Sequence, residues 1–330
     1  MPSVSIRIFR WATIFIAFHI LLVLITPLVT VNSLLYPLRI DSTYVIQMRN
    51  SGDTAFIGHP MRPEELGMQY QKIIFRRNGQ PELRGWISYD STRYSAPLLC
   101  IVPDISESKI CYLNDVMEYH ARGFHVCLID MRGQGDSEGE FYDPGLNSAL
   151  DLTGLVQRLD TMKRVEFVAL LGVGTGAGIC IKASVDTSLK ASALVIQNAP
   201  QSLEKLFQKT VLHGWGGVLL PFLPVFKRSY ERKTGLDFHE HRYAEIFKNS
   251  HLPYSSVAAG FVSKTTMEGI KIVHESGNYA HKKLFLELHP KQDNPFHQYS
   301  RKYYDQICGH IKASRQSPVF KSRRKKLASE

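Results

Sequence analysis

The stretch "VEFVALLGVGTGAG" (165–178) decides the fold, because it joins an apolar run to a series of closely spaced glycines. Strands that are buried on both faces of a parallel sheet appear as short, nearly continuous apolar runs. Glycine permits backbone conformations and close approaches that other residues resist, so these glycines indicate a sharp turn into a helix. Such a turn serves either to bind a phosphate or to present a nucleophile.

The rest of the chain predicts an α/β fold with a mostly parallel sheet, helices on both faces and an opening hairpin. Apolar runs alternate with helix-like segments, which is typical of right-handed crossovers between parallel strands. In the segment 69–90, two alternating runs flank "RNGQ" (77–80), a hairpin signal. An insertion at about 202–250 is expected to form a helical cap. The expected strands are 96–102, 124–130, 165–172, 191–197, 255–262 and 282–288, and the expected helices are 111–123, 146–162, 177–186 and 299–311.

The segment "GVGTGA" (172–177) fits the dinucleotide-binding pattern G-x-G-x-x-G/A. That pattern also requires Asp or Glu about 20 residues further on, at the end of the next strand, to bind the ribose hydroxyls. The next strand ends in Gln197 and Asn198 instead. Nucleotide binding by this loop is therefore an alternative that only the glycines support.

The second pattern is the nucleophile elbow, G-x-S-x-G, in which the glycines keep side chains apart at a strained strand-to-helix turn. Gly172, Gly174 and Gly176 match its first, third and fifth positions. Ala177 and Gly178 are small enough for the helix to pack closely. In this pattern Gly174 stands at the position of the nucleophile.

From about 62 to 312 the chain resembles the α/β-hydrolase superfamily, and in particular its membrane-anchored, serine-aminopeptidase-like members. The hairpin that ends in "LRGW" (83–86) is similar to the opening strands of that family. The stretch "DMRGQGDSEG" (130–139) is similar to its D-x-R-G-x-G-x-S-x-G loop and is the most specific match. We expect its charged residues to hold the loop by hydrogen bonds and its glycines to permit the turns. The matching residues are Asp130, Arg132, Gly133, Gly135, Ser137 and Gly139.

The resemblance also implies catalytic positions that this chain does not fill. Acyl transfer in that family needs a serine, a histidine, an orienting acid and backbone donors for the oxyanion. Glycine stands at the position of the catalytic serine, serine at the position of the acid, and aspartate at the position of the histidine. A Pro-Asp pair replaces the His-Gly pair of the oxyanion loop. The degenerate positions are Gly174, Ser263 and Asp293 for the triad and Pro103, Asp104 and Ile105 for the oxyanion loop. The resemblance therefore predicts no catalytic residue.

Two other residues are candidates for a displaced mechanism. Thr175 follows the elbow position and His289 lies four residues before Asp293. In the register of Thr175, however, β-branched Val173 would stand where the tight turn needs a small residue. A histidine at a strand end is more typical of a structural role. The H-x-H in "DFHEHRY" (237–243) reads as a solvated surface, so we expect no metal site.

Residues 11–31, "WATIFIAFHILLVLITPLVTV", contain no Asp, Glu, Lys or Arg and can cross about 30 Å of hydrocarbon as a helix. A cleaved secretory signal is the alternative, but its apolar region usually runs about 7–15 residues. The sequence thus predicts a single-pass membrane anchor after a tail at 1–10, with membrane lipid as a partner. Arg7 and Arg10 precede the span and favour a domain on the exported side.

The composition suits one large domain, because 44% of the 330 residues are hydrophobic. That domain is expected at 67–312, after a connector at 32–66. The net charge of +10 is concentrated at the C-terminus, so 313–330 is predicted to be a basic, disordered tail. No aromatic residues are interleaved there as in nucleic-acid-binding segments. The five cysteines cannot pair completely and form no C-x-x-C, so the sequence gives little support to a zinc or redox site.

These features predict a membrane-anchored, non-catalytic relative of the hydrolases with a binding or scaffold role. Its partner would be a small molecule or a protein that the sequence does not identify, without a cofactor. The first alternative is an active esterase or peptidase that uses Thr175 and His289. The second is a nucleotide-binding protein.

Overall fold

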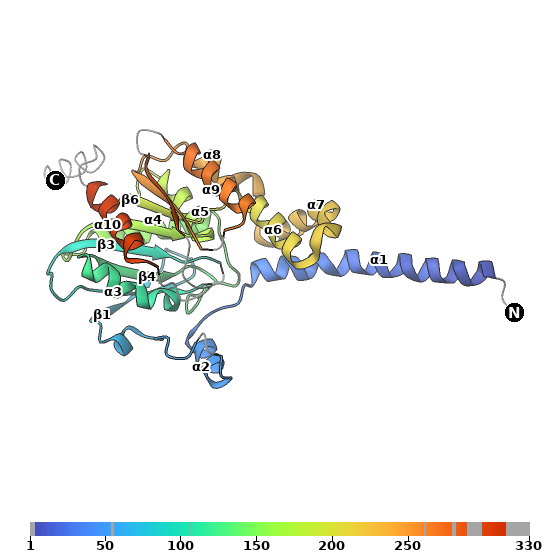
Figure 1. The fold of residues 1–330 in the computed structure, drawn as a ribbon, viewed down its shortest axis with the longest axis horizontal. Helices are drawn as coiled ribbons and strands as arrows, with labels where there is room; N and C mark the ends of the chain where they lie inside the picture. Colours follow the sequence, from blue (N-terminus) through green and yellow to red (C-terminus); the bar gives the residue numbers. More distant parts are fainter. Residues whose placement is uncertain are drawn as a thin grey trace.

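The computed structural model describes residues 4–53, 56–105, 107–260, 262–278, 282–288 and 299–314. They form one sheet flanked by helices, with helix α1 (Val4–Leu35) extending away from the body (Figure 1). The strands are β1 (Tyr70–Phe75), β2 (Leu83–Ser88), β3 (Ala96–Val102), β4 (His125–Asp130), β5 (Val165–Val173), β6 (Ala191–Gln197), β7 (Tyr254–Ala259) and β8 (Lys282–Leu288). Their order in the sheet is β1-β2-β4-β3-β5-β6-β7-β8.

The opening hairpin is the antiparallel part of the sheet. Strand β2 pairs antiparallel with both β1 and β4, whereas β4, β3 and β5 to β8 run parallel. Gln80 N donates to Arg77 O at 2.8 Å in the turn, and Gly79 has a φ of +70°. The hairpin predicted from Asn78 and Gly79 is thus confirmed, as is the mostly parallel sheet.

Strand β5 shows how the sheet buries both of its faces. Val168 and Leu170 belong to a core with α4 and α5, whereas Ala169 and Leu171 belong to a core with α3 and α10. This alternation follows from the period of two in a strand and explains why the run is apolar throughout. The five cysteines are buried and free. The helices that cover the sheet are α3 (Leu113–Ala121), α4 (Leu146–Asp160), α5 (Thr175–Ser184), α9 (Lys264–Ser276) and α10 (Arg301–Ala313).

The insertion at 202–250 forms a helical cap with a small core of its own. Aromatic side chains from its different helices meet there, among them Phe207, Tyr230 and Phe238. The pairs of these rings lie 5.3–5.8 Å apart between centroids, in T-shaped or tilted contacts. The elements of the cap are α6 (Leu203–Trp215), η3 (Gly216–Phe222), α7 (Leu223–Thr234), η4 (Phe238–His241) and α8 (Tyr243–Phe247).

Helix α1 contains the whole segment predicted to be a membrane anchor. It lies beside α7 of the cap (Figure 1), and Lys233 Nζ donates to Asn32 Oδ1 at 2.9 Å. Among the residues that the structure describes, no helix is both long enough and apolar enough to cross a membrane. The connector at 32–66 holds α2 (Ser42–Asn50) and the short helix η1 (Pro63–Leu66), and the predicted basic tail lies outside the described residues apart from its first two positions.

Candidate functional site

A single residue, Gly174, separates the end of β5 from the start of α5. Its φ of +52° and ψ of −119° lie in a region that L-amino acids rarely adopt. Gly174 N donates to Gln197 O at 2.8 Å, and Ala177 N donates to Gly174 O at 3.1 Å. The turn therefore has the strand-to-helix form of a nucleophile elbow, with a glycine at its tip.

The neighbouring glycines are required by close packing. A Cβ on Gly172 would lie 2.6 Å from Ala177 Cα, and a Cβ on Gly176 would collide with the carbonyl oxygen of Val102 at the end of β3. The start of α5 is thus packed closely against the sheet, which both the elbow and the nucleotide-binding loop require.

The carboxylate of Asp104 fills the space beside Gly174. Its Oδ1 accepts hydrogen bonds from Ile105 N at 2.7 Å, from Thr175 N at 2.8 Å and from Thr175 Oγ1 at 2.8 Å. A Cβ built on Gly174 would overlap this carboxylate. In elbow enzymes the oxyanion hole is formed by the N–H after the nucleophile and an N–H from the loop after the third strand. Asp104 occupies that place with its own carboxyl group.

Several groups hold Asp104 in this position. Gln134 Nε2 donates to Asp104 O at 2.6 Å, and Asp104 N donates to Glu107 Oε2 at 3.3 Å. Tyr142 OH donates to Thr175 Oγ1 at 2.6 Å, so the threonine hydroxyl has a partner on each side. Desolvation, together with the nearby carboxylate of Glu107, raises the pKa of Asp104 above its ordinary value.

The structure does not assemble a triad from the predicted positions that it describes. Ser263 is exposed and caps α9, where its Oγ accepts from Thr266 N at 3.3 Å. Asp293 and the candidate base His289 lie outside the described residues. Within the described part of the chain, neither Asp104 nor Thr175 forms a hydrogen bond with a histidine. Thr175 itself is only 1% exposed.

Residues at the end of β6 contribute to the site and were not foreseen from the sequence. Gln197 Oε1 accepts from Tyr303 OH at 2.7 Å, and its Nε2 donates to Tyr299 OH at 2.5 Å. Asn198 is the one non-glycine residue with a positive φ, +51°, in the described ranges. Its side chain bonds both Ala259 O at 2.7 Å and Ala259 N at 2.9 Å, which ties β6 to β7.

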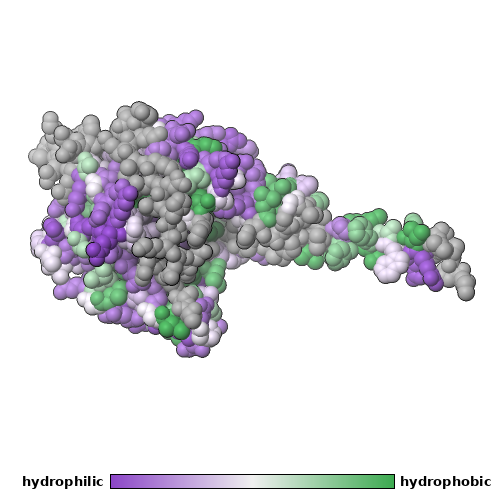
Figure 2. All heavy atoms as spheres, in the orientation of Figure 1, coloured by the Kyte–Doolittle hydropathy of each residue, from purple (hydrophilic) through white to green (hydrophobic). Residues whose placement is uncertain are grey.

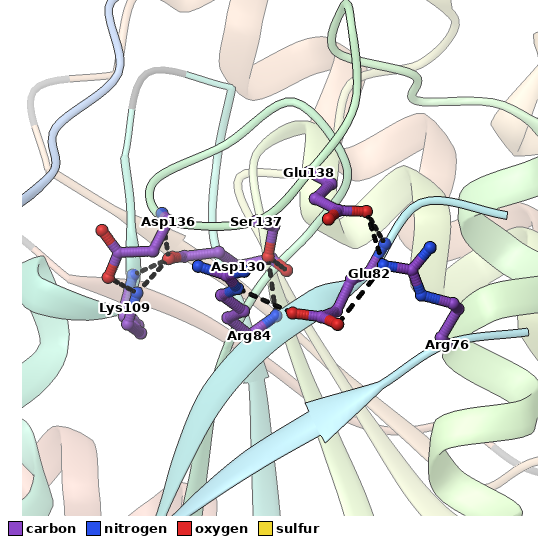
Figure 3. A network of polar contacts seen from close by, with 8 residues as sticks. All are labelled: Arg76, Glu82, Arg84, Lys109, Asp130, Asp136, Ser137 and Glu138. Carbon is purple, nitrogen blue, oxygen red and sulfur yellow. Dashed lines mark hydrogen bonds and ion pairs between the residues drawn. The ribbon is translucent and has the colours of Figure 1, made fainter.

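The loop at 130–139 is held by a buried lysine. Lys109, 2% exposed, forms ion pairs with Asp130, which is fully buried, and with Asp136 at 2.6 Å (Figure 3). Burial alone would lower the pKa of Lys109, but the two carboxylates outweigh it and raise that pKa. Asp130 O also accepts from Ser137 Oγ at 2.6 Å. The interactions of this loop are with the protein itself, which fits a structural role.

The remaining matching residues of that loop also make structural contacts. Arg132 Nε donates to Asp151 Oδ2 at 2.9 Å, and Gly133 N donates to Glu138 O at 3.0 Å. Gly135 has a φ of +43°, and a Cβ there would strike the Asp130 carboxylate. Gly139 O accepts from Arg39 Nη2 at 2.6 Å. The loop is thereby linked both to α4 and to the connector.

The H-x-H segment of the cap, His239 to His241, is not fully solvated, contrary to the prediction, and its two histidines are not arranged with other described residues to hold a metal ion. His241 is buried, its Nδ1 donates to Asp237 O at 2.7 Å, and Lys182 Nζ lies 3.4 Å from its Nε2. Burial and the nearby lysine charge lower the pKa of His241 to about 4. His239 is exposed. In the described ranges, no group of three or more His, Cys, Asp or Glu residues is arranged to hold a metal ion.

An open pocket of about 650 Å³ lies on the cap and includes no residue of the elbow. The pocket is lined by both positively and negatively charged side chains. Two of them form an ion pair, in which Lys227 Nζ donates to Glu204 Oε1 at 3.0 Å. It is lined by Glu204, Leu223, Pro224, Lys227, Arg228, Glu231, Gly235, Leu236, Asp237 and His239.

Comparisons with known proteins agree with this geometry. The family model described as serine aminopeptidase, S33, matches residues 96–301. An esterase from Pyrococcus furiosus is 16% identical, with a TM-score of 0.58 over 77% of this chain and 94% of the esterase. An α/β hydrolase from a Penicillium species is 15% identical, with a TM-score of 0.54 over 75% of this chain and 99% of that one. No curated protein matches the chain. At these identities the structural likeness shows the fold alone.

Proposed function

We propose that this chain, which belongs to the serine aminopeptidase family S33, is a member that binds a ligand or a partner and does not hydrolyse a substrate. The observation that carries the proposal is the Asp104 carboxylate in the space beside Gly174. Acyl transfer needs an oxygen or sulfur nucleophile at the elbow, and glycine supplies none. The fold by itself does not imply an enzyme.

The electrostatics of the site also oppose hydrolysis. An oxyanion hole works because its donors stabilise the negative charge that develops in the transition state. Here the N–H groups of Ile105 and Thr175 already donate to the Asp104 carboxyl group, so they are not free to stabilise a developing oxyanion. Loss of a triad member alone typically lowers the rate by orders of magnitude, and the residual rate depends on the oxyanion hole.

The alternative of an active esterase or peptidase depends on Thr175 as nucleophile. Its hydroxyl donates to Asp104 and accepts from Tyr142, and the side chain is buried. A nucleophile must reach the substrate carbonyl from an exposed position, so this arrangement argues against Thr175.

Treatment of the purified full chain with a fluorophosphonate probe is expected to give no stoichiometric adduct, and p-nitrophenyl acetate is expected to show no turnover above the buffer rate. An active serine hydrolase of the same fold, treated in parallel, is the positive control. A stoichiometric adduct on a Ser or Thr at the elbow would refute the proposal. Turnover that is abolished by Thr175→Val or His289→Gln would establish the alternative instead.

We further propose that the chain binds membrane lipid through α1. The support is the exposure of large apolar side chains along this helix, including Phe9 at 74%, Trp11 at 71% and Phe15 at 64%. Figure 2 shows hydrophobic residues along the part of α1 that projects from the body. Burial of such side chains in lipid stabilises each by about 1.5–3 kcal/mol.

Flotation with phosphatidylcholine and phosphatidylserine vesicles tests this second proposal. The full chain is expected to float, and Phe9→Glu with Phe15→Glu is expected to reduce the floated fraction at least about tenfold, since two buried rings are lost. The matched control replaces Ile57 and Tyr94 by Glu, because these residues are 61% and 74% exposed elsewhere on the protein. Equal flotation of both variants would contradict a role for α1.

A further inference from the structure

We propose that the cap is a second membrane-docking surface, whose partner is a bilayer that contains anionic lipid. The end of η3 and the start of α7 enter the apolar layer, and the basic part of α7 contacts the lipid headgroups. This inference rests on the proposed lipid binding by α1 and extends it to a separate element of the fold. Its basis is the order of apolar and basic side chains along α7, which lies beside α1 (Figure 1).

Large apolar side chains are exposed where α6, η3 and α7 adjoin. Val225 is 53% exposed, Leu212 45% and Leu220 38%, although the cap has a core in which its other apolar side chains are buried. Pro221 and Pro224 beside them are also exposed. Figure 2 shows hydrophobic residues on the cap next to α1. A group of exposed apolar side chains from adjoining elements indicates a surface that contacts a membrane or another protein.

The remaining part of α7 is basic. Its sequence is LPVFKRSYERKT, so an apolar first turn is followed by four basic residues and one acidic residue. Arg228, Arg232 and Lys233 are exposed. Among the described residues neither arginine is part of an ion pair, whereas Lys227 pairs with Glu204. Guanidinium groups bind phosphate oxygens bidentately, and each basic residue at an anionic membrane surface contributes about 1 kcal/mol.

The contact between α7 and α1 sets the level of the two ends of α7. Lys233, near the end of α7, donates to Asn32, which directly follows the apolar stretch 11–31. Only three residues of α1 follow Asn32, so the rest of α7 lies alongside the apolar stretch (Figure 1). At a rise of about 1.5 Å per residue, Val225 is about 12 Å from Lys233 along the helix. The basic end is therefore level with the end of the apolar stretch, and the apolar end lies beside the stretch itself.

This order matches the layers at the surface of a bilayer. An interfacial element buries its apolar side about 5–10 Å into the boundary between headgroups and acyl chains, while its basic side chains remain among the headgroups. A two-fold dimer through the same surface would also cover the apolar side chains, but it would bring two sets of basic side chains together. Anionic lipid neutralises these charges instead, which favours a membrane over a second copy of the chain.

A photoreactive lipid tests the inference on the unsubstituted full chain. The chain is bound to phosphatidylcholine and phosphatidylserine vesicles that carry a trace of lipid with a diazirine on its acyl chain, and the labelled peptides are identified by mass spectrometry. We expect label in α1 and, separately, within 220–225. Label in α1 alone would overturn this inference and leave lipid binding by α1 standing. Absence of label from both segments would refute both proposals.

A depth measurement compares the two ends of α7 with a control site. A fluorophore is attached to Val225→Cys, Arg232→Cys or Tyr94→Cys, and the unsubstituted chain, whose five cysteines are buried, gives the background. Tyr94 is 74% exposed and precedes β3, at the edge of the sheet opposite the cap. We expect an acyl-chain nitroxide to quench most of the fluorescence at position 225, a headgroup nitroxide to quench position 232, and neither to quench position 94.

Two results of this measurement would count against the inference. Equal quenching at positions 225 and 94 would show that the start of α7 does not enter lipid. A blue shift of the fluorophore at position 225 without quenching by either lipid would indicate that a protein covers the surface instead.

Two double variants with the same loss of charge test the basic part of α7. Arg228→Gln with Arg232→Gln is expected to weaken partitioning onto phosphatidylserine-containing vesicles by on the order of tenfold or more, since two contributions of about 1 kcal/mol are lost. Lys163→Gln with Lys190→Gln is the matched control, because both lysines are exposed and precede strands β5 and β6 at the edge opposite the cap. Equal losses for the two double variants would contradict docking through α7.

Discussion

Gly174→Ala is expected to lower the free energy of unfolding by about 2–6 kcal/mol, the sum of a strained backbone and an overpacked site. The φ of +52° is unfavourable for any side chain, and the new methyl group would overlap the Asp104 carboxylate. Either the methyl group or Asp104 has to move, and movement of Asp104 would break its hydrogen bonds to Thr175. Urea denaturation of the variant and the wild-type chain measures the difference.

A matched substitution separates the two contributions. Gly235 has a φ of +69°, but a Cβ there would meet open space, so Gly235→Ala should cost only the conformational part, about 1–2 kcal/mol. Combining Gly174→Ala with Asp104→Gly should recover the part that is due to overlap. If Gly174→Ala destabilises no more than Gly235→Ala, the overlap with Asp104 is not an energetic constraint.

The second large effect is expected at Lys109. Lys109→Met leaves Asp130 buried without its cation, and breaking a buried ion pair in this way costs about 3–5 kcal/mol. Asp130 keeps the N–H groups of Lys109 and Asp136 as donors, so the fold is expected to survive. Guanidinium denaturation should show a lower midpoint with an unchanged slope.

Arg76 offers the control in the same network (Figure 3). Its side chain is 50% exposed and pairs with Glu138, which is 44% exposed, at 2.9 Å. Such exposed pairs are screened by water, so Arg76→Met is expected to have little measurable effect. Replacing Asp130 by Asn together with Lys109→Met should restore part of the lost stability, because the fully buried charge is removed and the remaining carboxylate, Asp136, is 36% exposed to water. If Lys109→Met and Arg76→Met lower the free energy of unfolding by the same amount, burial is not the reason for the large effect expected at Lys109.

The sheet could be predicted because its strands are short, nearly continuous apolar runs. A run such as "ALVI" within β6 is apolar on both faces, and the alternation with helical segments leaves few topologies. Helix α9 was missed because only Ile270, Val273 and His274 of its side chains are buried. So narrow an apolar stripe is hard to distinguish from a polar loop.

The site was predicted only in part. The glycine pattern identified the turn, since glycine is the residue that tolerates both its close contacts and its positive φ. The replacement of a His-Gly pair by Pro103 and Asp104 was also visible. The sequence could not show where the Asp104 carboxylate points, because its position depends on contacts with Thr175, 71 positions along the chain. Gln197 and Tyr303, 106 positions apart, escaped notice for the same reason.

The overlap between position 174 and Asp104 also constrains how this sequence can change over evolutionary time. A serine that arises at 174 first would be excluded from the elbow by the carboxylate. Loss of Asp104 first would leave the donors of Ile105 and Thr175 without their acceptor. Each single change is expected to give a less stable protein, so positions 104 and 174 can change freely only together.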